Sequence, residues 1–208
     1  MNGRFITLEG GEGAGKSTQA KRLAAALEKR GIKVVTTREP GGSPGAEEIR
    51  GLLVNGEPGR WDALTETLLI YGARADHVKR TIGPALLADQ WVISDRFTDS
   101  TYAYQGAGRG LPREIIRRID SVVLDDFRPD LTLILDLDVD TGLGRAGARG
   151  GAEQRFEKFD RDFHQKLRQA FLDIANRSAD RCAVIDAGQS EDLVAEAIWA
   201  ATARRFSL

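Results

Sequence analysis

The feature that most limits how this chain can fold is a glycine-rich loop placed between a strand and a helix. Residues 10–17, with the sequence GGEGAGKS, match the pattern G-x-x-x-x-G-K-[ST]. The apolar stretch 5–8 before them predicts a short strand, and apolar residues at helical spacing between 20 and 27 predict an amphipathic helix after them. A glycine-rich turn that arose by chance would lack this context. The sequence therefore predicts an α/β fold that begins with a phosphate-binding loop.

The chemistry of this loop favours a nucleoside triphosphate. Consecutive backbone N–H groups in such a loop point at phosphate oxygens, and the helix that follows presents the positive end of its dipole. Lys16 can reach the β- and γ-phosphates, and the hydroxyl of Ser17 can ligate the magnesium ion that bridges them. The residues expected to hold the triphosphate are Gly10, Gly11, Glu12, Gly13, Ala14, Gly15, Lys16, Ser17 and Thr18.

Length and charge limit the domain count and the classes of partner. The 208 residues suffice for one well-buried domain and are too few for two of usual size, so we expect a single domain over residues 1–208. The formal net charge is −1, and basic and acidic residues are interspersed, which argues against binding to nucleic acid or to an anionic membrane. No apolar run approaches membrane-spanning length. Small phosphorylated molecules fit this composition better.

The cysteine and histidine content indicates a reducing cytoplasm and no zinc site. Cys182 is the only cysteine, which excludes an intramolecular disulfide, and its apolar neighbours favour a buried strand position. The first expected strand begins a few residues after Met1, which leaves no room for a signal peptide. His77 and His164 have no second histidine or cysteine at ligand spacing, so packing or surface roles are expected for them.

Short apolar strands alternate with stretches of helical periodicity along the whole chain. This alternation predicts a parallel sheet with helices on both faces, and right-handed crossovers then bring the carboxyl ends of all strands to one edge. Ligands of open α/β folds bind at that edge. Two further glycine-rich stretches, 106–110 and 142–151, are expected to be mobile loops. The expected strands are 5–8, 33–37, 91–94, 131–137 and 182–186, and the longest expected helices are 61–87 and 190–205.

Two charged residues follow the third expected strand and point to a second site beside the loop. Asp95 can hold magnesium waters, and the guanidinium of Arg96 can fork onto a phosphate. A surface salt pair at a strand end is the alternative interpretation.

A helix and a polar cluster offer groups for an acceptor molecule. Arg74 lies three residues after Tyr71 on the apolar face of helix 61–87, where a phosphate beside a stacked base would give the guanidinium a partner. An internal carboxylate or an extended side chain reaching solvent is equally plausible. Thr101 offers a hydroxyl and Gln105 an amide that can pair with a pyrimidine edge, although such a cluster alone usually forms an ordinary turn.

Three arginines lie in and around the second glycine-rich stretch, and they suggest a lid. A flexible basic segment over about 145–157 suits a lid that closes over a nucleotide, excludes water and brings arginine to the transferring phosphoryl group. Solvated arginines on a disordered loop are the alternative. The arginines concerned are Arg145, Arg149 and Arg155.

Taken together and in order, these segments resemble the thymidylate kinase family over nearly the whole chain. The quoted segments are the phosphate loop with Glu12, residues 38–42 (REPGG), 71–74 (YGAR), 95–97 (DRF) and 100–106 (STYAYQG), and the lid arginines. The resemblance implies ATP-dependent phosphorylation of dTMP to dTDP with Mg²⁺. It also implies a three-layer α/β/α P-loop NTPase fold of the nucleoside monophosphate kinase type, with a five-stranded parallel sheet, usually as a homodimer.

The resemblance also implies roles for single residues. Glu12 would meet the sugar 3′-hydroxyl, Tyr71 would stack on thymine, and Tyr104 would lie under the deoxyribose. Residues 39–40 would form a cis-proline turn. The dTMP-binding residues implied are Glu12, Arg38, Pro40, Tyr71, Arg74, Arg96, Ser100, Thr101, Tyr104 and Gln105. The catalytic residues implied are Lys16, Arg96, Arg149 and Arg155, and those near the metal are Ser17, Asp95 and Glu157.

Two other functions are considered from the sequence. One is a kinase for another acceptor, such as dUMP, CMP or an unphosphorylated deoxynucleoside, although the pair Arg74 and Arg96 favours a phosphorylated acceptor. The other is a nucleotide-controlled switch without an acceptor. The chain contains neither an N-K-x-D segment nor an L-S-G-G-Q segment, which argues against a GTPase and a transport ATPase.

Overall fold

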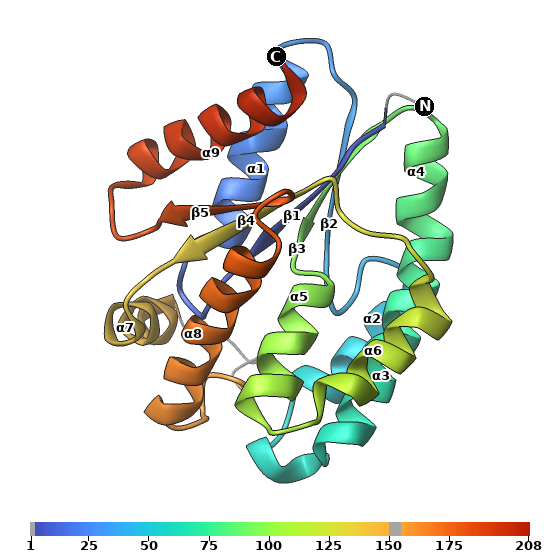
Figure 1. Cartoon of the computed structure of the whole chain (residues 1–208), viewed down its shortest axis with the longest axis vertical. Coiled ribbons are helices and arrows are strands. Elements are labelled where there is room, and N and C mark those ends of the chain that lie inside the picture. The colour runs from blue at the N-terminus through green and yellow to red at the C-terminus, as the bar shows by residue number, and fades with distance from the viewer. Residues whose placement is uncertain (1–2, 150–154) are drawn as a thin grey trace.

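The protein forms a parallel sheet with helices on both faces, as the sequence predicts. The computed structural model describes residues 3–149 and 155–208. Within these ranges the sheet has five strands in the order β2-β3-β1-β4-β5, and all neighbouring strands are parallel (Figure 1). The expected strands are confirmed to within about two residues at each end. Their bounds are β1 Phe5–Glu9, β2 Val34–Arg38, β3 Trp91–Asp95, β4 Leu131–Asp136 and β5 Cys182–Asp186.

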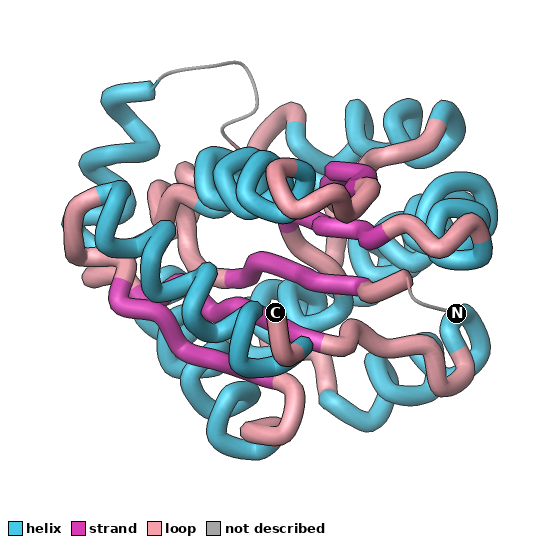
Figure 2. Tube along the Cα trace, turned by 90° about the horizontal axis from the view of Figure 1, so that it is seen from above, coloured by secondary structure: helices cyan, strands magenta, loops and turns pink. Residues whose placement is uncertain are grey.

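Helices fill the connections and form the outer layers. Figure 2 shows the strands as a middle layer between helices. Helices α1 and α9 lie side by side on one face, whereas α4 and α8 pack against the other (Figure 1). The helices are α1 Lys16–Glu28, α2 Pro44–Val54, η1 Pro58–Arg60, α3 Ala63–His77, η2 Val78–Ile82, α4 Gly83–Leu87, α5 Thr98–Thr101, η3 Tyr102–Gly108, α6 Arg113–Leu124, α7 Val139–Arg149, α8 Arg161–Arg177 and α9 Glu191–Phe206.

The three layers follow from the alternation of side chains along each strand. Successive residues of a strand point to opposite faces of a sheet. Ile6 of β1 and Leu133 of β4 are buried against α1 and α9, whereas Phe5 and Ile134 are buried in clusters on the other face. β1 is the central strand of the sheet and pairs in parallel with β3. The carboxyl ends of both strands therefore lie near the centre of one edge of the sheet.

The two long expected helices are present and have side-chain caps. Asp62 accepts hydrogen bonds from the backbone N–H groups of residues 64 and 65, both at 2.9 Å, and so satisfies donors that a helix start leaves unpaired. The helix then continues from α3 through the π-turn η2 into α4. Ser190 caps α9 in the same way.

Residues 106–108 and 142–149 of the two further glycine-rich stretches are helical and do not form the loops expected from the sequence. Gly106 and Gly108 lie in η3, and Gly142 lies inside α7. These glycines permit close packing: a Cβ on Gly142 would lie 2.5 Å from the carbonyl oxygen of Glu12, and one on Gly108 would lie 2.5 Å from the Phe163 ring. Helix α7 can therefore rest directly against the phosphate loop. Residues 150–154 of the expected lid lie outside the described residues.

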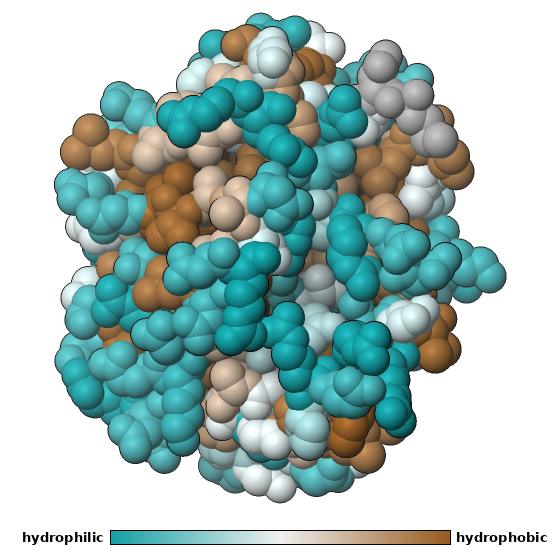
Figure 3. Space-filling view, viewed as in Figure 1, coloured by the Kyte–Doolittle hydropathy of each residue, from teal (hydrophilic) through white to brown (hydrophobic). Residues whose placement is uncertain are grey.

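The surface is mainly hydrophilic on the face seen in Figure 3, with apolar residues in separate patches. Among the described residues, no helix is both long enough and apolar enough to cross a membrane.

Candidate active site

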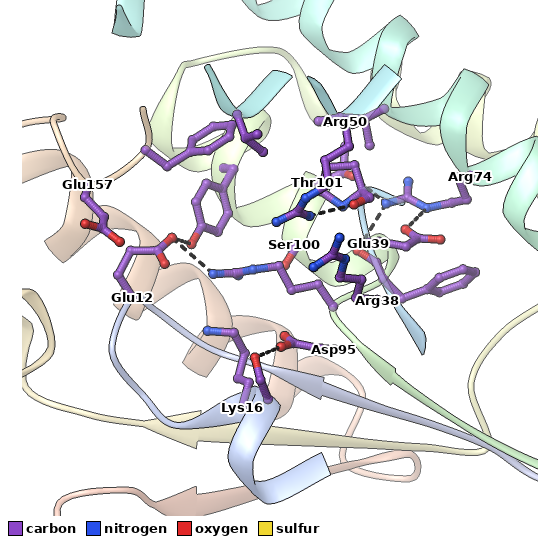
Figure 4. Close-up of a pocket in the computed structure, with 18 of the residues that line it drawn as sticks. Glu12, Lys16, Arg38, Glu39, Arg50, Arg74, Asp95, Ser100, Thr101 and Glu157 are labelled. Carbon is purple, nitrogen blue, oxygen red and sulfur yellow. Dashed lines mark hydrogen bonds and ion pairs between the residues drawn. The ribbon is translucent and has the colours of Figure 1, made fainter. Parts of the chain in front are cut away.

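The carboxyl edge of the sheet contains a cavity of about 540 Å³, lined by the phosphate loop, the ends of β2 and β3, helices α2 and α3, and η3 (Figure 4). Most residues expected to bind substrates meet there, although they come from segments far apart in the sequence. The expected residues that line it are Glu12, Gly13, Gly15, Lys16, Ser17, Thr18, Arg38, Pro40, Arg74, Asp95, Arg96, Ser100, Thr101, Tyr104, Gln105 and Glu157.

The phosphate loop has the backbone shape that its glycines permit. Gly13 has a φ of 67°, and a Cβ there would collide with the Gly142 carbonyl of α7. Helix α1 begins at Lys16, so its positive end faces the cavity. The Lys16 ammonium donates to the carbonyls of Gly10 at 3.2 Å and Gly11 at 2.7 Å. These two residues and Ala14, all expected to hold the triphosphate, do not line this cavity.

Lys16 is buried beside another cation, which changes its acid–base behaviour. Burial, together with the charge of Arg96, lowers the pKa of Lys16 to about 8, against the opposing effect of the Glu12 carboxylate. The ammonium group therefore carries a charge that is not fully compensated by the protein. A bound phosphate would compensate it.

A second cluster joins the phosphate loop to β3 and η3. The Arg96 guanidinium and the Tyr104 hydroxyl both bind one carboxylate oxygen of Glu12, at 3.1 and 2.6 Å (Figure 4). Burial alone would raise the pKa of Glu12, but Arg96 and Lys16 outweigh it and lower the pKa to about 2. Glu12 is therefore a carboxylate that orients a cation and a phenol at the cavity wall.

Arg96 is held in place by an unusual backbone conformation. Its φ is 75°, which costs a residue other than glycine about 1–3 kcal/mol, and such conformations occur where the surroundings enforce them. Here Ser94 donates to the Arg96 carbonyl at 2.8 Å, and the next N–H, of Phe97, donates to Glu9 at 2.7 Å. The buried Glu9 also accepts from Ser100 at 2.6 Å. The turn therefore aims the guanidinium into the cavity.

Arg74 has an internal carboxylate partner, which the sequence allows as an alternative to a bound phosphate. Arg74 also lines the cavity. Its Nε donates to Glu39 at 2.7 Å, and Nη2 donates to the Phe97 carbonyl at 3.2 Å and to Thr101 at 3.1 Å. Glu39 also contacts His77 at 3.0 Å, so His77 is a buried support of this site rather than a surface residue. The buried Nη1 of Arg74 has no hydrogen-bond partner among the described residues. This leaves a donor for an anionic ligand.

The expected stacking role of Tyr71 does not fit its position. Tyr71 is buried, its hydroxyl donates to Asp120 at 2.8 Å, and it is not among the residues that line the cavity. The preceding residue, Ile70, lines the cavity instead. One residue along an α-helix is a rotation of about 100°, so an assignment that is wrong by one position moves a side chain out of the site.

The predicted magnesium ligands come only partly together. The Ser17 hydroxyl donates to the Asp95 carboxylate across the end of β3 (Figure 4). Glu157 also lines the cavity, but Figure 4 places it beside Glu12 rather than beside this pair. Among the described residues there is no group of three or more acidic, histidine or cysteine ligands.

Of the expected lid arginines, Arg145 and Arg155 are described, and neither lines the cavity. Arg155 is fully buried: it donates to the carbonyls of residues 53, 57 and 58 at about 3.0 Å and pairs with Glu66 at 2.5 Å. The prediction that Arg155 reaches ATP therefore does not fit this geometry. Arg145 donates to the Ala187 carbonyl at 3.1 Å. Arg149 ends α7, and its side chain lies outside what the structure describes.

Several cavity residues were not predicted. Arg50 of α2 lines the cavity and donates to the Pro40 carbonyl at 2.7 Å, so the cavity has one more cation than the sequence suggested. The signal available was its position two turns into a helix that starts beside the sheet edge. The cis peptide expected before Pro40 is present. The other unpredicted lining residues are Glu39, Val54, Ile70, Phe97 and Phe156.

Comparison with known proteins agrees with this site. The family model described as thymidylate kinase matches residues 8–198. The chain belongs to the thymidylate kinase family. A thymidylate kinase of Caulobacter vibrioides is 54% identical over 206 residues, covering 99% of both chains, and one of Magnetococcus marinus is 50% identical, covering 99% of this chain and 98% of the relative. The crystal structure of a thymidylate kinase from Ehrlichia chaffeensis matches with a TM-score of 0.76 and 35% identity, covering 96% of this chain and 98% of that one. The family and fold predicted from the sequence are confirmed, as is the class of enzyme, an ATP-dependent kinase.

Proposed function

We propose that this protein transfers the γ-phosphoryl group of ATP to the phosphate of dTMP, giving dTDP and ADP, with the residues of the cavity described above. Membership of the thymidylate kinase family supports the reaction. The observation that carries the assignment of residues is the continuity of the cavity, which contains the phosphate loop and Lys16 at one end and Arg74, with its unpartnered donor, at the other. Two phosphorylated ligands can meet there end to end.

The transfer needs positioning and charge neutralisation rather than a covalent intermediate. The acceptor phosphate is already ionised, so it needs no strong general base, and phosphoryl transfer is accelerated mainly by alignment and by cations on the transferring group. Lys16 and Arg96 are the cations nearest the loop. Their ammonium and guanidinium groups would neutralise charge that builds up between donor and acceptor.

The other end of the cavity holds the acceptor. Arg74, Arg50 and Arg38 line it and would bind the dTMP phosphate and base edge, with Ile70 against the base. The Tyr104 hydroxyl, fixed by Glu12, lies where the sugar would pass from phosphate to base. A bulky ring there would disfavour a ribose 2′-hydroxyl.

The oxygen donors of Ser17 and Asp95 fit Mg²⁺, which prefers few protein ligands and keeps water and phosphate oxygens in its shell. When bound there, the ion would lower the charge repulsion between donor and acceptor phosphates. Asp95 would hold water molecules of the ion's coordination shell. Ser17 would break its hydrogen bond to Asp95, so that the Ser17 hydroxyl oxygen could bind the ion. The magnesium role of Glu157 rests on the family resemblance alone.

A coupled ADP-release assay tests this function. The protein is given ATP and Mg²⁺ with dTMP, dUMP, dCMP, CMP or no acceptor, and activity with dTMP well above all others is expected. The Lys16→Ala variant should keep the fold by circular dichroism and lose turnover by roughly a hundredfold or more, because it removes a transition-state cation. Equal ADP release with and without acceptor would support a nucleotide switch instead, and normal turnover of Lys16→Ala would refute the role of the lysine.

The homodimer and the cytoplasmic location belong to the same proposal. Large apolar side chains stay exposed on two helices that pack together, Leu64 and Leu68 on α3 and Val122 on α6, and they support a partner surface there. The single cysteine supports a reducing compartment. Sedimentation equilibrium should give twice the chain mass, and a monomer at micromolar concentration would contradict the dimer.

A further inference from the structure

A chain of buried contacts runs from Arg155, near the end of the expected lid, to the cavity. The carboxylate of Glu66 on α3 lies between two guanidinium groups, with Arg155 Nη1 at 2.5 Å from one oxygen and Arg109 Nη1 at 3.0 Å from the other. The oxygen near Arg109 also accepts from Nε2 of Gln105 at 2.8 Å. Glu66 and Gln105 are both almost completely buried, and Glu66 itself does not line the cavity.

These contacts determine which way the Gln105 amide faces. A carboxylate between two guanidinium groups accepts hydrogen bonds and donates none, so the nitrogen of the amide must face Glu66. The amide oxygen, Oε1, is then the free end: it is buried and has no hydrogen-bond partner among the described residues. Gln105 lines the cavity, so a ligand that reaches the free end of this amide meets an acceptor rather than a donor.

The acceptor selects among pyrimidines. On the base edge of thymine or uracil the only N–H donor is at N3, whereas N3 of cytosine carries a lone pair and no hydrogen. A buried acceptor that meets another acceptor loses its hydrogen bond and is left unsatisfied. The donor of cytosine is its N4 amino group, so a Gln105 oxygen that meets position N3 suits thymine and uracil and opposes cytosine.

We infer that Glu66, held by Arg155 and Arg109, is a positioning residue that fixes the orientation of Gln105 and so makes the acceptor site selective for bases with an N3–H. This rests on the proposed dTMP kinase activity and extends it to the source of base selectivity. It also gives Arg155 a role in the acceptor site that differs from the expected contact with ATP. Glu66 acts through Gln105 and does not touch the substrate.

The test compares kcat/KM for dTMP, dUMP and dCMP in the wild type and in Glu66→Gln. A neutral amide at position 66 can donate as well as accept, so Gln105 is free to turn its nitrogen toward the ligand. We expect the dTMP-to-dCMP ratio to fall by at least about tenfold, because the wild-type ratio depends on one enforced hydrogen bond. The dTMP-to-dUMP ratio should change by less than about twofold, because both bases carry the same N3–H.

Asp120→Asn is the matched control. Asp120 is a buried carboxylate of similar exposure that binds Tyr71 and Arg128 and has no contact with Gln105, so its loss should change stability and leave both ratios as in the wild type. Glu66→Asp keeps the charge for the two arginines but shortens the reach to Gln105, and it carries the test if Glu66→Gln does not fold.

The outcomes separate the inference from the function on which it rests. If the wild type does not phosphorylate dTMP, the proposed function fails. If the wild type is active and folded Glu66 variants keep the wild-type dTMP-to-dCMP ratio, with only lower melting temperatures, Glu66 is purely structural and the inference is wrong. A fall in that ratio at a constant dTMP-to-dUMP ratio supports it.

Discussion

Lys16 is buried beside the second cation Arg96, and this makes its charge sensitive to pH just above neutrality. Its pKa, lowered to about 8, means that the free protein binds a proton there below pH 8 and loses it above. A bound polyphosphate favours the charged lysine and raises that pKa again. Binding of ADP or ATP should therefore take up a proton at high pH and weaken as the pH rises.

We expect the dissociation constant of Mg·ADP to increase above pH 8, by up to about tenfold per pH unit, because each unit removes one order of magnitude of protonated Lys16. Isothermal titration calorimetry between pH 7 and 9.5 measures it, and buffers of different ionisation enthalpy report the proton uptake. Binding of dTMP in the same buffers is the control. A constant ADP affinity over this range would contradict the assigned environment of Lys16.

Glu9 shows the opposite effect of burial on a carboxyl group. Burial, with the nearby Asp99 carboxylate, raises its pKa to about 8, against the hydrogen bond from Ser100 and the charge of Arg96. A group whose pKa is higher in the folded than in the unfolded state stabilises the fold fully below the unfolded value, near 4.5. That contribution is lost as the pH rises through 8.

Glu9→Gln mimics the protonated side chain and does not titrate. Its amide oxygen can accept from the Phe97 N–H, and its nitrogen can donate to Ser100. The variant should therefore become more stable relative to the wild type as the pH rises from 5 to 9. Thermal unfolding across that range tests this, and a pH-independent difference in melting temperature would show that Glu9 does not titrate in the folded state.

At the scale of an element, the orientation of α3 decides which side chain meets the acceptor. Ile70 faces the cavity, whereas Tyr71 is turned toward Asp120. Tyr71→Phe should destabilise the fold by about 1–3 kcal/mol, because it leaves a buried carboxylate with one partner fewer, and should leave the KM for dTMP nearly unchanged.

Ile70→Ala should have the opposite effect, with its main consequence for the KM for dTMP. Loss of apolar contact with the base equal to one or two buried methylenes, at about 0.8 kcal/mol each, should raise the KM for dTMP by roughly four- to fifteenfold. Chemical unfolding and steady-state kinetics on both variants separate the two roles. A large increase in KM for Tyr71→Phe together with none for Ile70→Ala would restore the stacking role predicted from the sequence.

Sequence patterns identify features that repeat along the chain, but they do not identify single tertiary contacts. Hydrophobic periodicity located the five strands and the ends of the longest helices, because burial on a sheet or helix face repeats along the chain. The phosphate loop was recognised because backbone geometry requires its glycines in one order. Gly142 was wrongly predicted to lie in a loop, because its close contact with Glu12 arises only from the tertiary structure.

The same limit applies to the site residues. A partner over eighty residues away in the chain decides where Arg155 points, and nothing near it in the sequence encodes Glu66. Whether Tyr71 or Ile70 faces the cavity depends on how α3 packs on α6. Periodicity in the sequence gives the orientation of a helix only to about one residue. Strand ends placed Asp95 and Arg96 correctly because the edge of a parallel sheet is fixed by topology.

At the scale of the whole molecule, the fold brings two anion sites into one cavity without a partition between them. In the proposed function, the donor site would be the loop after β1, and the acceptor site would be built by β2, α2 and α3. Four arginines and one lysine, each from a different segment, line the cavity, while the chain as a whole has a net charge of −1. The positive charge is local, and it suits a pair of phosphate chains that meet end to end.

A single molecule that spans both sites tests this arrangement. Adenosine and thymidine joined through their 5′ oxygens by five phosphates would occupy the two nucleoside sites and fill the phosphate path between them. Because one association step replaces two, the compound should bind more tightly than ADP or dTMP alone by a factor of about a hundred or more. Competition against ATP and against dTMP, with the shift in melting temperature, measures the affinity.

The same linkage between two adenosines controls for charge, and it should bind more weakly because adenine does not offer the N3–H edge that Gln105 accepts. If both compounds bound no better than ADP, the acceptor would have to lie outside the cavity between Lys16 and Arg74.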